Sequence, residues 1–457
     1  MFIIEANEVP EDVFKWYASI SKGSISSFIE KEQIANTVTD DVSEKYLYPS
    51  QAWASISTSQ SADKHKIRWY NDAKSNSPFY WRELAKKGKN VLLMGVLHSG
   101  SITEKEMLNY DFVFPDFFHL EPKVSKSNYL PFQKFNYEIS VLSGRKTSLK
   151  VVFMQALKSF IKYPILKFWG VSLKDILVLL NLMIKSIKDP EMLRNIQFLL
   201  QARIFLNESK VGLGKDLSVL FTNHIAATLH RNFTDLSQVS KENENKKNKI
   251  KYSMFLLDRF LNELESLNKN REIIILTALG QKKNDKITRK YKSSNQLDYK
   301  IIDKDKFINF FIGQNNNVDF LPEMIPQYSF YFHRKEDRKL FLSKLQKIGS
   351  DPNSIRFGYY VPSGKKNTKT DGFFMHIDQR DEVITCTTSI RPNKEGFIKM
   401  NNKKIHFEKL GFGEFKVKDF HNGEHSKFGC LISSKNKPKK SKFHFSEVSN
   451  LIKKNIS

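Results

Sequence analysis

Cysteine is almost absent from this chain: only Cys386 and Cys430 occur among its 457 residues. Two thiols cannot form the disulfide framework of a small secreted scaffold, and no Cys-x-x-Cys pair is present to bind a metal. The N-terminal residues also lack the basic segment and the long apolar segment of a secretory signal. We therefore expect a cytoplasmic protein that is stabilised by a large core rather than by cross-links.

Long apolar runs and acidic residues are scarce as well. The most apolar stretch, residues 176–184, is far shorter than the roughly 20 residues of a membrane-spanning helix. There are 74 Lys and Arg against 49 Asp and Glu, a formal net charge of +25. This balance favours anionic partners such as acidic or phosphorylated glycans or a peripheral membrane contact, although a lysine-rich solvated surface explains it equally well. Nucleic acid is not an expected partner, because the lysines are dispersed and no reading motif occurs.

Short apolar runs alternate with helical patterns along most of the chain. This alternation predicts an α/β fold with a mostly parallel central sheet flanked by helices. The polar residues 235–251 predict a mobile loop or a frayed helix before an amphipathic helix at 252–268. Strands are expected at residues 2–5, 91–95, 113–114, 219–221, 273–276 and 429–432.

The composition divides the chain into four segments. Residues 1–147 and 211–355 are expected to form the α/β core, and residues 148–210 a helical insertion that acts as a cap or lid. Apolar residues recur in the insertion at helical spacing, so a helical subdomain that packs its own apolar stripe is the simpler alternative. Residues 356–457 hold short alternating runs, which predict a small antiparallel β region and the C-terminal part of the core.

A hydroxyl residue, Ser50, follows Pro49 and precedes an apolar run rich in Ser and Ala. Such a residue can lie at a strand-to-helix turn, where a helix N-terminus can receive an anion. Ser50 is therefore a candidate nucleophile, and a helix N-cap is the alternative. Gln51 and Trp53 follow on the same helix as candidate substrate-binding residues, with ordinary aromatic packing as the alternative for Trp53.

Polar side chains also follow several predicted strands. In an open α/β sheet, ligands bind beyond the carboxyl ends of the strands. Glu5 and Asn7 lie at the end of the first strand and are candidates for substrate binding, since burying them without a role is costly. Comparable polar ends or turns occur at residues 222–224, 277–281 and 419–425.

The order of these pieces resembles the alkaline phosphatase superfamily, on its phosphodiesterase, nucleotide pyrophosphatase and sulfatase side. In that superfamily a strand ends in a metal-binding Asp, and a Ser or Thr nucleophile then begins a helix. The run Pro49-Ser50, Thr58-Ser59 and His65-Lys66-Ile67 is similar, and the resemblance covers most of residues 1–125 and 215–435. It implies a hydrolase or transferase of a phosphate or sulfate ester with Ser50 as nucleophile, and we expect a glycan or glycan precursor as its substrate. A divergent bacterial group with PSQ-W-AS, TNH and GQ signatures is most similar.

Departures from the family pattern concern the metals. Asn7 stands where the first metal-binding Asp is expected, and Ala278 and Leu279 replace an expected Asp-His pair. Because an amide is a weak ligand and alkyl side chains are none, one of two metal sites is expected to be lost. A remaining site could hold one divalent ion, Zn or Mn. Its candidate ligands are Asn223, His421 and His425, with Glu5 or Glu8 as additional groups.

Two further histidines are candidate general bases. His224 and His230 flank the start of a helix, where they would point in different directions, whereas Asn223 and His230 would share one face. For both histidines a structural role in the core is the alternative. The missing ligands also support a second hypothesis: a metal-degenerate relative that binds an anionic glycan or a partner without catalysis.

Overall fold

The structure is a computed structural model, and its described residues divide into two compact units. Unit 1 comprises Met1–Tyr137, Thr147–Ile287 and His421–Ser457, and unit 2 comprises Glu138–Lys146 and Thr288–Phe420. The four-segment division made from the sequence stays a prediction, and the helix expected at 149–163 lies outside the described residues. The structure describes residues 1–456 except 40–46, 119–121, 143–168, 190–191, 211–214, 238–239, 268, 284–296, 315–316, 322, 324–326, 350–355, 360–373, 381, 390–396, 401–402 and 417–422.

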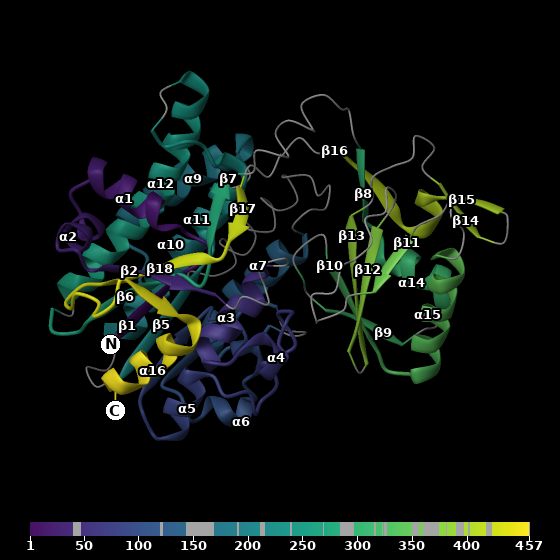
Figure 1. The fold of residues 1–457 in the computed structure, drawn as a ribbon, viewed down its shortest axis with the longest axis horizontal. Coiled ribbons are helices and arrows are strands. Elements are labelled where there is room, and N and C mark those ends of the chain that lie inside the picture. The colour runs from purple at the N-terminus through teal and green to yellow at the C-terminus, as the bar shows by residue number, and fades with distance from the viewer. Residues whose placement is uncertain are drawn as a thin grey trace. The chain divides into compact units, whose positions relative to one another are not determined.

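An eight-stranded, mostly parallel sheet forms the centre of unit 1 (Figure 1). Strand β1 (Phe2–Ala6) runs parallel between β5 (Leu217–Thr222) and β6 (Ile273–Leu276), and every residue of these three strands is buried. Strands covered on both faces have nearly continuous apolar sequences, which is why these runs were predictable. The predicted α/β fold is confirmed. Across the sheet the order is β19 (Lys442–His444), β2 (Ile34–Val38), β18 (Phe428–Ser433), β6, β1, β5, β3 (Val91–Met94) and β4 (Phe112–Phe114), with β18 antiparallel to both neighbours.

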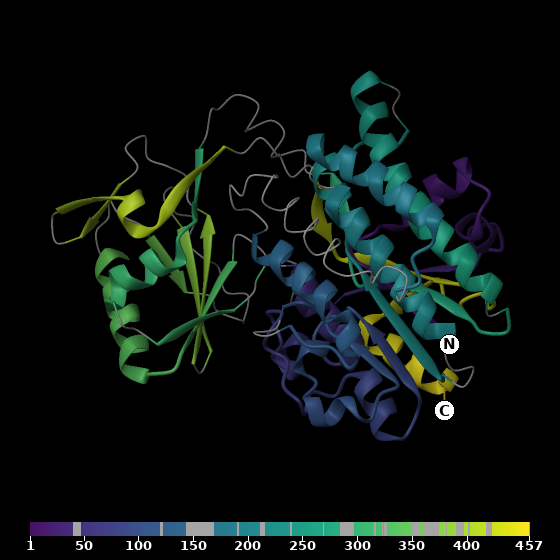
Figure 2. The same cartoon turned by 180° about the vertical axis from the view of Figure 1, so that it is seen from behind.

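Helices cover both faces of this sheet (Figures 1 and 2). Phe2 of β1 packs against Phe205 of α10 (Met192–Lys210), whereas Glu5 accepts a hydrogen bond from Tyr80 of α5 (Tyr80–Lys86). Since successive strand residues point to opposite faces, α10 and α5 lie on opposite sides. The division between the units falls within α7 (Leu130–Leu142), after Tyr137. The other described α-helices of unit 1 are α1 (Glu11–Ile20), α2 (Ser24–Glu30), α3 (Pro49–Thr58), α4 (Ala62–His65), α6 (Glu104–Met107), α9 (Leu173–Lys188), α11 (His224–Asn232), α12 (Lys241–Leu267) and α16 (Phe445–Ile456).

Helix α12 begins at Lys241, earlier than the expected residue 252. Residues 235–251 were expected to form a mobile loop or a frayed helix, and the helical alternative holds from Lys241 onward. Burial explains the difference, because Ile250, Met254 and Leu257 are fully buried although the first turns are polar. Ion pairs also tie this helix to the insertion: Asp175 of α9 binds Arg203 of α10 and Arg259 of α12 at 3.0 and 2.8 Å.

Unit 2 has its own sheet and its own core. Two helices, α14 (Lys304–Ile312) and α15 (Lys335–Gly349), contribute to a phenylalanine-rich core that includes Phe307, Phe330 and Phe341. The predicted antiparallel region is present, but its sheet is separate from the main sheet and includes strands as early as β9. Its strand order is β11 (Arg356–Tyr359), β12 (Phe374–Arg380), β13 (Val383–Ser389), β10 (Gln327–Phe332) and β9 (Val318–Leu321).

Three two-stranded ribbons complete the described chain. Two belong to unit 2: β14 (Phe397–Met400) with β15 (Lys403–His406), and β8 (Leu297–Ile301) with β16 (Phe412–Lys416). The third, in unit 1, pairs β7 (Gly280–Lys283) with β17 (Gly423–Ser426) and positions the site described below. Among the described residues, no helix is both long and apolar enough to cross a bilayer.

Candidate metal centre

The carboxyl ends of β1, β5 and β6 meet at one edge of the sheet, because these strands are parallel neighbours. Asn7 and Glu8 directly follow β1, and α11 begins directly after β5 and Asn223. Beyond β6 the chain turns into β7, which pairs with β17 so that His425 lies opposite Gln281. Segments distant in sequence therefore meet at the edge where ligands bind in open α/β sheets.

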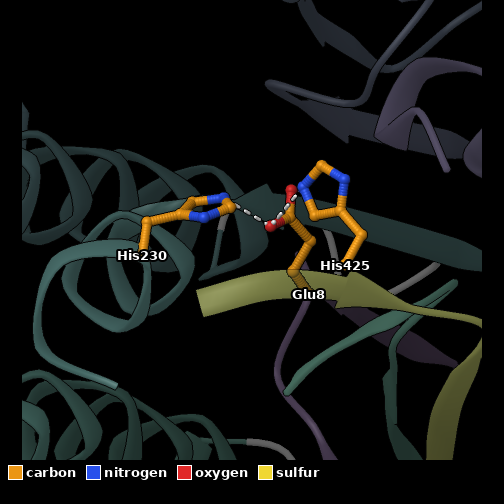
Figure 3. A group of neighbouring side chains, drawn as sticks. All are labelled: Glu8, His230 and His425. Atoms are coloured by element: carbon orange, nitrogen blue, oxygen red, sulfur yellow. Dashed lines mark ion pairs between the residues drawn. The ribbon is translucent and has the colours of Figure 1, made fainter. Parts of the chain in front are cut away.

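Glu8, His230 and His425 converge at this edge (Figure 3). Glu8 Oε2 lies 2.7 Å from His230 Nε2 and 3.1 Å from His425 Nε2. The Glu8 side chain is 2% exposed, whereas those of His230 and His425 are 20% and 27% exposed. The carboxylate is thus buried beneath two imidazoles that reach solvent.

Backbone carbonyls orient both imidazoles. His425 Nδ1 lies 2.5 Å from the Leu47 carbonyl oxygen, and His230 Nδ1 lies 3.4 Å from that of Gly423. A carbonyl only accepts, so Nδ1 carries the proton and Nε2 of a neutral ring presents a lone pair toward Glu8. Two lone pairs facing a carboxylate oxygen repel it unless protons or a cation lie between them.

Charge coupling in this cluster is strong. Burial favours a neutral Glu8, but the positive charges of His425 and His230 outweigh it and hold the pKa of Glu8 well below its ordinary value. Burial likewise disfavours a charged His425, and the Glu8 carboxylate outweighs this and raises the pKa of His425. The centroids of the two rings lie 5.3 Å apart, so a positive charge on each ring would repel the other.

The donor set fits one divalent ion. One ligand atom from each of the three residues lies within 4.8 Å of the others. A carboxylate and two imidazoles bind Zn²⁺ or another first-row divalent metal and leave further coordination positions open. A single divalent ion would also take the place of protons between the Glu8 carboxylate and the two Nε2 atoms. Both Zn²⁺ and Mn²⁺ accept a ligand set of one carboxylate and two imidazoles.

Neighbouring amides hold the Glu8 carboxylate. Asn7 Nδ2 donates to Glu8 Oε1 and to Asn223 Oδ1, both at 2.8 Å, and Trp53 Nε1 donates to Asn7 Oδ1 at 2.8 Å. Gln281 Nε2 donates to Glu8 Oε2 at 2.7 Å. Asn7 and Gln281 therefore support the carboxylate, which is the usual role of groups around metal ligands.

Backbone geometry at Glu8 and Gly423 fits this arrangement. Glu8 has φ 57°, a left-handed conformation that costs a residue with a Cβ about 1 kcal/mol or more and often marks a functional site. A Cβ on residue 423 would collide with Gln281 Oε1, so glycine lets the β7–β17 ribbon approach. The Gln281 amide is also held by Ala226 O at 3.2 Å, and its Oε1 has no hydrogen-bond partner among the described residues.

Ser50 is the second residue of α3, after Pro49, and the N-cap is Tyr48. The N-cap alternative for Ser50 is therefore wrong. Its hydroxyl is buried and donates to the Arg68 carbonyl, while its own carbonyl accepts from His98 Nε2 at 2.8 Å. Gln51 is buried beside it. Ser50 thus begins a helix as predicted, with its hydroxyl directed to the backbone.

His224 lies in the core. Its ring stacks on Phe198, and its nitrogens contact Thr222 Oγ1 at 2.7 Å and Ser253 O at 3.0 Å. Burial lowers the pKa of His224 to about 3, which keeps it neutral. This environment is that of a structural histidine. His421, a predicted ligand, lies outside the described residues.

The remaining predicted residues occupy two environments. Asn7, Asn223 and Trp53 join the hydrogen-bonded network that supports Glu8. Glu5 is buried against α5, where burial raises its pKa to about 8 and Tyr80 donates to it at 3.2 Å. The structure thus brings together His230, His425 and the network of Asn7, and places Glu5, Ser50 and His224 in separate hydrogen-bonding environments.

Sequence reasoning missed Gln281 and named Glu8 only beside Glu5. Glu5 and Asn7 were preferred as substrate-binding candidates at the end of the first strand. Glu8 comes after the strand, and its left-handed backbone redirects its side chain. The position of Glu8 directly after an apolar strand was the available signal, and for Gln281 it was the polar turn 277–281 that follows the strand at 273–276.

No protein-family model matches this chain, and no curated protein is significantly similar to it. Solved structures are similar at low TM-scores. Phosphonoacetate hydrolase from Sinorhizobium meliloti 1021 has a TM-score of 0.42 and 10% identity, over 100% of this chain and 95% of its own. Human ectonucleotide pyrophosphatase / phosphodiesterase 5 has a TM-score of 0.37 and 7% identity, over 100% and 94%. A mutant of alkaline phosphatase PafA has a TM-score of 0.39 and 12% identity, over 100% and 95%.

Such low similarity assigns neither an activity nor a residue role to this chain. The phosphonoacetate hydrolase, the phosphodiesterase and PafA are themselves members of the alkaline phosphatase superfamily.

Proposed function

We propose that this protein is a metal-dependent hydrolase or transferase of a phosphate or sulfate ester, with one divalent ion held by Glu8, His230 and His425. The observation that carries the proposal is the convergence of one carboxylate and two Nε2 atoms at the carboxyl edge of the sheet. The ester class comes from the resemblance of the sequence to the superfamily. Zn and Mn both suit the donors.

The residues of the cluster have separable roles. Glu8, His230 and His425 would hold the ion, while Asn7 and Gln281 keep the carboxylate in place through 2.8 and 2.7 Å hydrogen bonds. A bound divalent ion would supply positive charge to the anionic ester and activate a nucleophile. Because the imidazoles reach solvent, the ester would approach from their side.

Ser50 remains our proposed nucleophile on the strength of the resemblance. Its hydroxyl donates to the Arg68 carbonyl, so attack requires that hydroxyl to turn away from its present acceptor. We compare Ser50→Ala with Ser57→Ala, another buried serine of α3. We expect Ser50→Ala to lower kcat at least about a hundredfold and Ser57→Ala to leave it nearly unchanged. Full activity of Ser50→Ala excludes the nucleophilic role.

We propose a glycan or glycan precursor as the carrier of the ester. The net charge of +25 supports an anionic substrate of this kind. A comparison of phosphorylated and sulfated glycans with simple aryl esters tests this point. Equal kcat/KM for both classes would contradict a glycan preference.

Metal content is the first experiment. Protein stripped with a chelator is reloaded with Zn²⁺ or Mn²⁺, analysed by mass spectrometry for elements, and assayed on bis(p-nitrophenyl) phosphate, p-nitrophenyl phosphate and an aryl sulfate. We expect about one ion per chain, and a loss of metal affinity of at least about a hundredfold in Glu8→Gln and His425→Gln. His333→Gln is the matched control, because His333 forms an exposed pair with Asp319 in unit 2. Unchanged metal content in both cluster variants would refute the site.

A second candidate is a binding protein without catalysis. The observation that favours it is that Ala278 and Leu279, which replace the expected Asp-His pair, are fully buried in the core. Such a protein would bind an anionic glycan or a partner through the same edge. Stoichiometric metal with turnover on any of the three esters decides for the enzyme; glycan binding with no turnover in the metal-loaded protein decides for the binding protein.

A further inference from the structure

Helix α9 carries a row of exposed apolar side chains. They recur every three or four residues and therefore form one stripe along the helix. Exposed single apolar residues are common on protein surfaces, whereas a contiguous row marks an interaction site. The row consists of Leu173, Leu177, Leu180, Ile184 and Ile187, which are 82%, 69%, 51%, 68% and 62% exposed.

The opposite side of α9 is fixed to unit 1. Leu179 and Leu182 are buried, and Asp175 is completely buried in ion pairs with Arg203 and Arg259. The N-terminus of the helix is closed by a capping box between Ser172 and Asp175. These contacts fix how α9 is rotated about its axis. The apolar row therefore lies on the exposed side of the helix.

The exposed charges beside the row are basic, apart from Asp189 at the end of α9, which is paired with Lys249. Lys174 and Lys185 are exposed on α9 beside the row. Along the chain, no Asp or Glu occurs between Glu138 and Asp175, and this acid-free stretch is rich in aliphatic and aromatic residues. Its basic residues are Arg145, Lys146, Lys150, Lys158, Lys162, Lys167 and Lys174.

We propose that α9 docks unit 1 onto an anionic lipid bilayer, with the helix lying in the plane of the interface. Helices that bind membrane surfaces combine an apolar face with Lys or Arg at its border. Apolar burial and attraction to anionic headgroups are two signals that together give stable but reversible binding. The exposed lysines of α9 beside the row complement anionic lipid, and the net charge of +25 disfavours a second copy of the chain as the occupant.

Vesicle flotation tests the proposal with the full chain. Vesicles of phosphatidylcholine alone are compared with vesicles that also contain about a third phosphatidylglycerol. We expect binding to the anionic vesicles, weakened by salt, and little binding to the neutral ones. The double variant Leu177→Ser/Ile184→Ser should lower the partition coefficient about tenfold or more, because it removes two apolar contacts and leaves the charge unchanged.

Two controls make the result specific. Leu108→Ser/Leu340→Ser removes two other exposed leucines, 85% and 41% exposed, and should bind like the unchanged protein. Lys174→Glu should weaken binding to anionic vesicles while leaving the melting temperature unchanged. Since the substituted side chains are exposed, all variants should keep the circular dichroism spectrum of the parent.

Three results would overturn the proposal. One is absence of vesicle binding by the unchanged protein; another is equal binding by the α9 and control double variants. The third is a dimer in sedimentation velocity that dissociates in Leu177→Ser/Ile184→Ser, which would make a second copy the occupant.

Discussion

Glu5→Gln should stabilise the protein more at alkaline pH than at acidic pH. Glu5 lies in the middle strand β1 and is 1% exposed. Burial raises its pKa from the ordinary 4.5 to about 8, an effect that the hydrogen bond from Tyr80 reduces. Glutamine keeps the acceptor oxygen for Tyr80 and removes the proton equilibrium.

The sign follows from proton linkage. Between the two pKa values the folded state holds a proton on Glu5 and the unfolded state does not, so the free energy of unfolding falls as pH rises. The full contribution of Glu5 to the free energy of unfolding is present below the pKa of Glu5 in the unfolded chain, 4.5. This contribution is lost as the pH rises to the pKa of Glu5 in the folded protein, about 8. From about pH 5 to about pH 8 the loss amounts to about 3 kcal/mol, since each pH unit between the two pKa values contributes at most about 1.4 kcal/mol. Glu5→Gln lacks this loss.

Chemical unfolding followed by tryptophan fluorescence measures the effect. All five tryptophans, Trp16, Trp53, Trp69, Trp81 and Trp169, lie within unit 1, so the signal reports the unit that contains Glu5. The stability difference between Glu5→Gln and the unchanged protein should grow with pH by about 3 kcal/mol, while Glu30→Gln, at an exposed position of α2, should show no such growth. A pH-independent difference for Glu5→Gln would refute the reasoning.

Two further predictions concern the supports of the site and of α9. Gln281→Leu removes the amide that donates to Glu8 at 2.7 Å, so affinity for Zn²⁺ or Mn²⁺, measured by competition with a chromophoric chelator, should fall about 10- to 100-fold; unchanged affinity would contradict its supporting role. Asp175→Asn leaves Arg203 and Arg259 without their buried carboxylate and should cost about 3 kcal/mol in the same fluorescence assay. Asp189→Asn, which breaks a more exposed pair with Lys249, should cost about 1 kcal/mol or less, and equal losses would refute the network.

The parallel core was predictable because its strands are buried on both faces. Residues 2–5 and 273–276 are nearly continuous apolar runs. Short runs of this kind are typical of strands that are covered on both faces. The start of α12 was not predictable, since residues 241–251 are polar and become helical through burial of a few positions such as Ile250. Strand β10 of unit 2 was missed for a related reason: one of its pairing partners, β13, lies more than fifty residues away along the chain, and β9 pairs in turn with β10.

The candidate site was predictable only in part. His230 and His425 were each recognisable as polar residues at turns near strand ends. Their convergence on Glu8 depends on the β7–β17 ribbon, whose register places His425 opposite Gln281. No local pattern encodes such a long-range register.

Asn7 and Glu8 together fit the proposal that the metal-binding carboxylate lies one residue beyond the position that the resemblance indicates. Its amide donates to Glu8 Oε1 and to Asn223 Oδ1, and its carbonyl oxygen accepts from Trp53. An aspartate at position 7 has no N–H to donate, so its oxygens would face the oxygen atoms of Glu8 and Asn223. It would also place a second negative charge beside a buried carboxylate. An amide at position 7 and a carboxylate at position 8 are therefore a matched pair. Asn7, which looks in the sequence like a lost ligand, is in the structure a donor to Glu8, the carboxylate that we propose as a metal ligand.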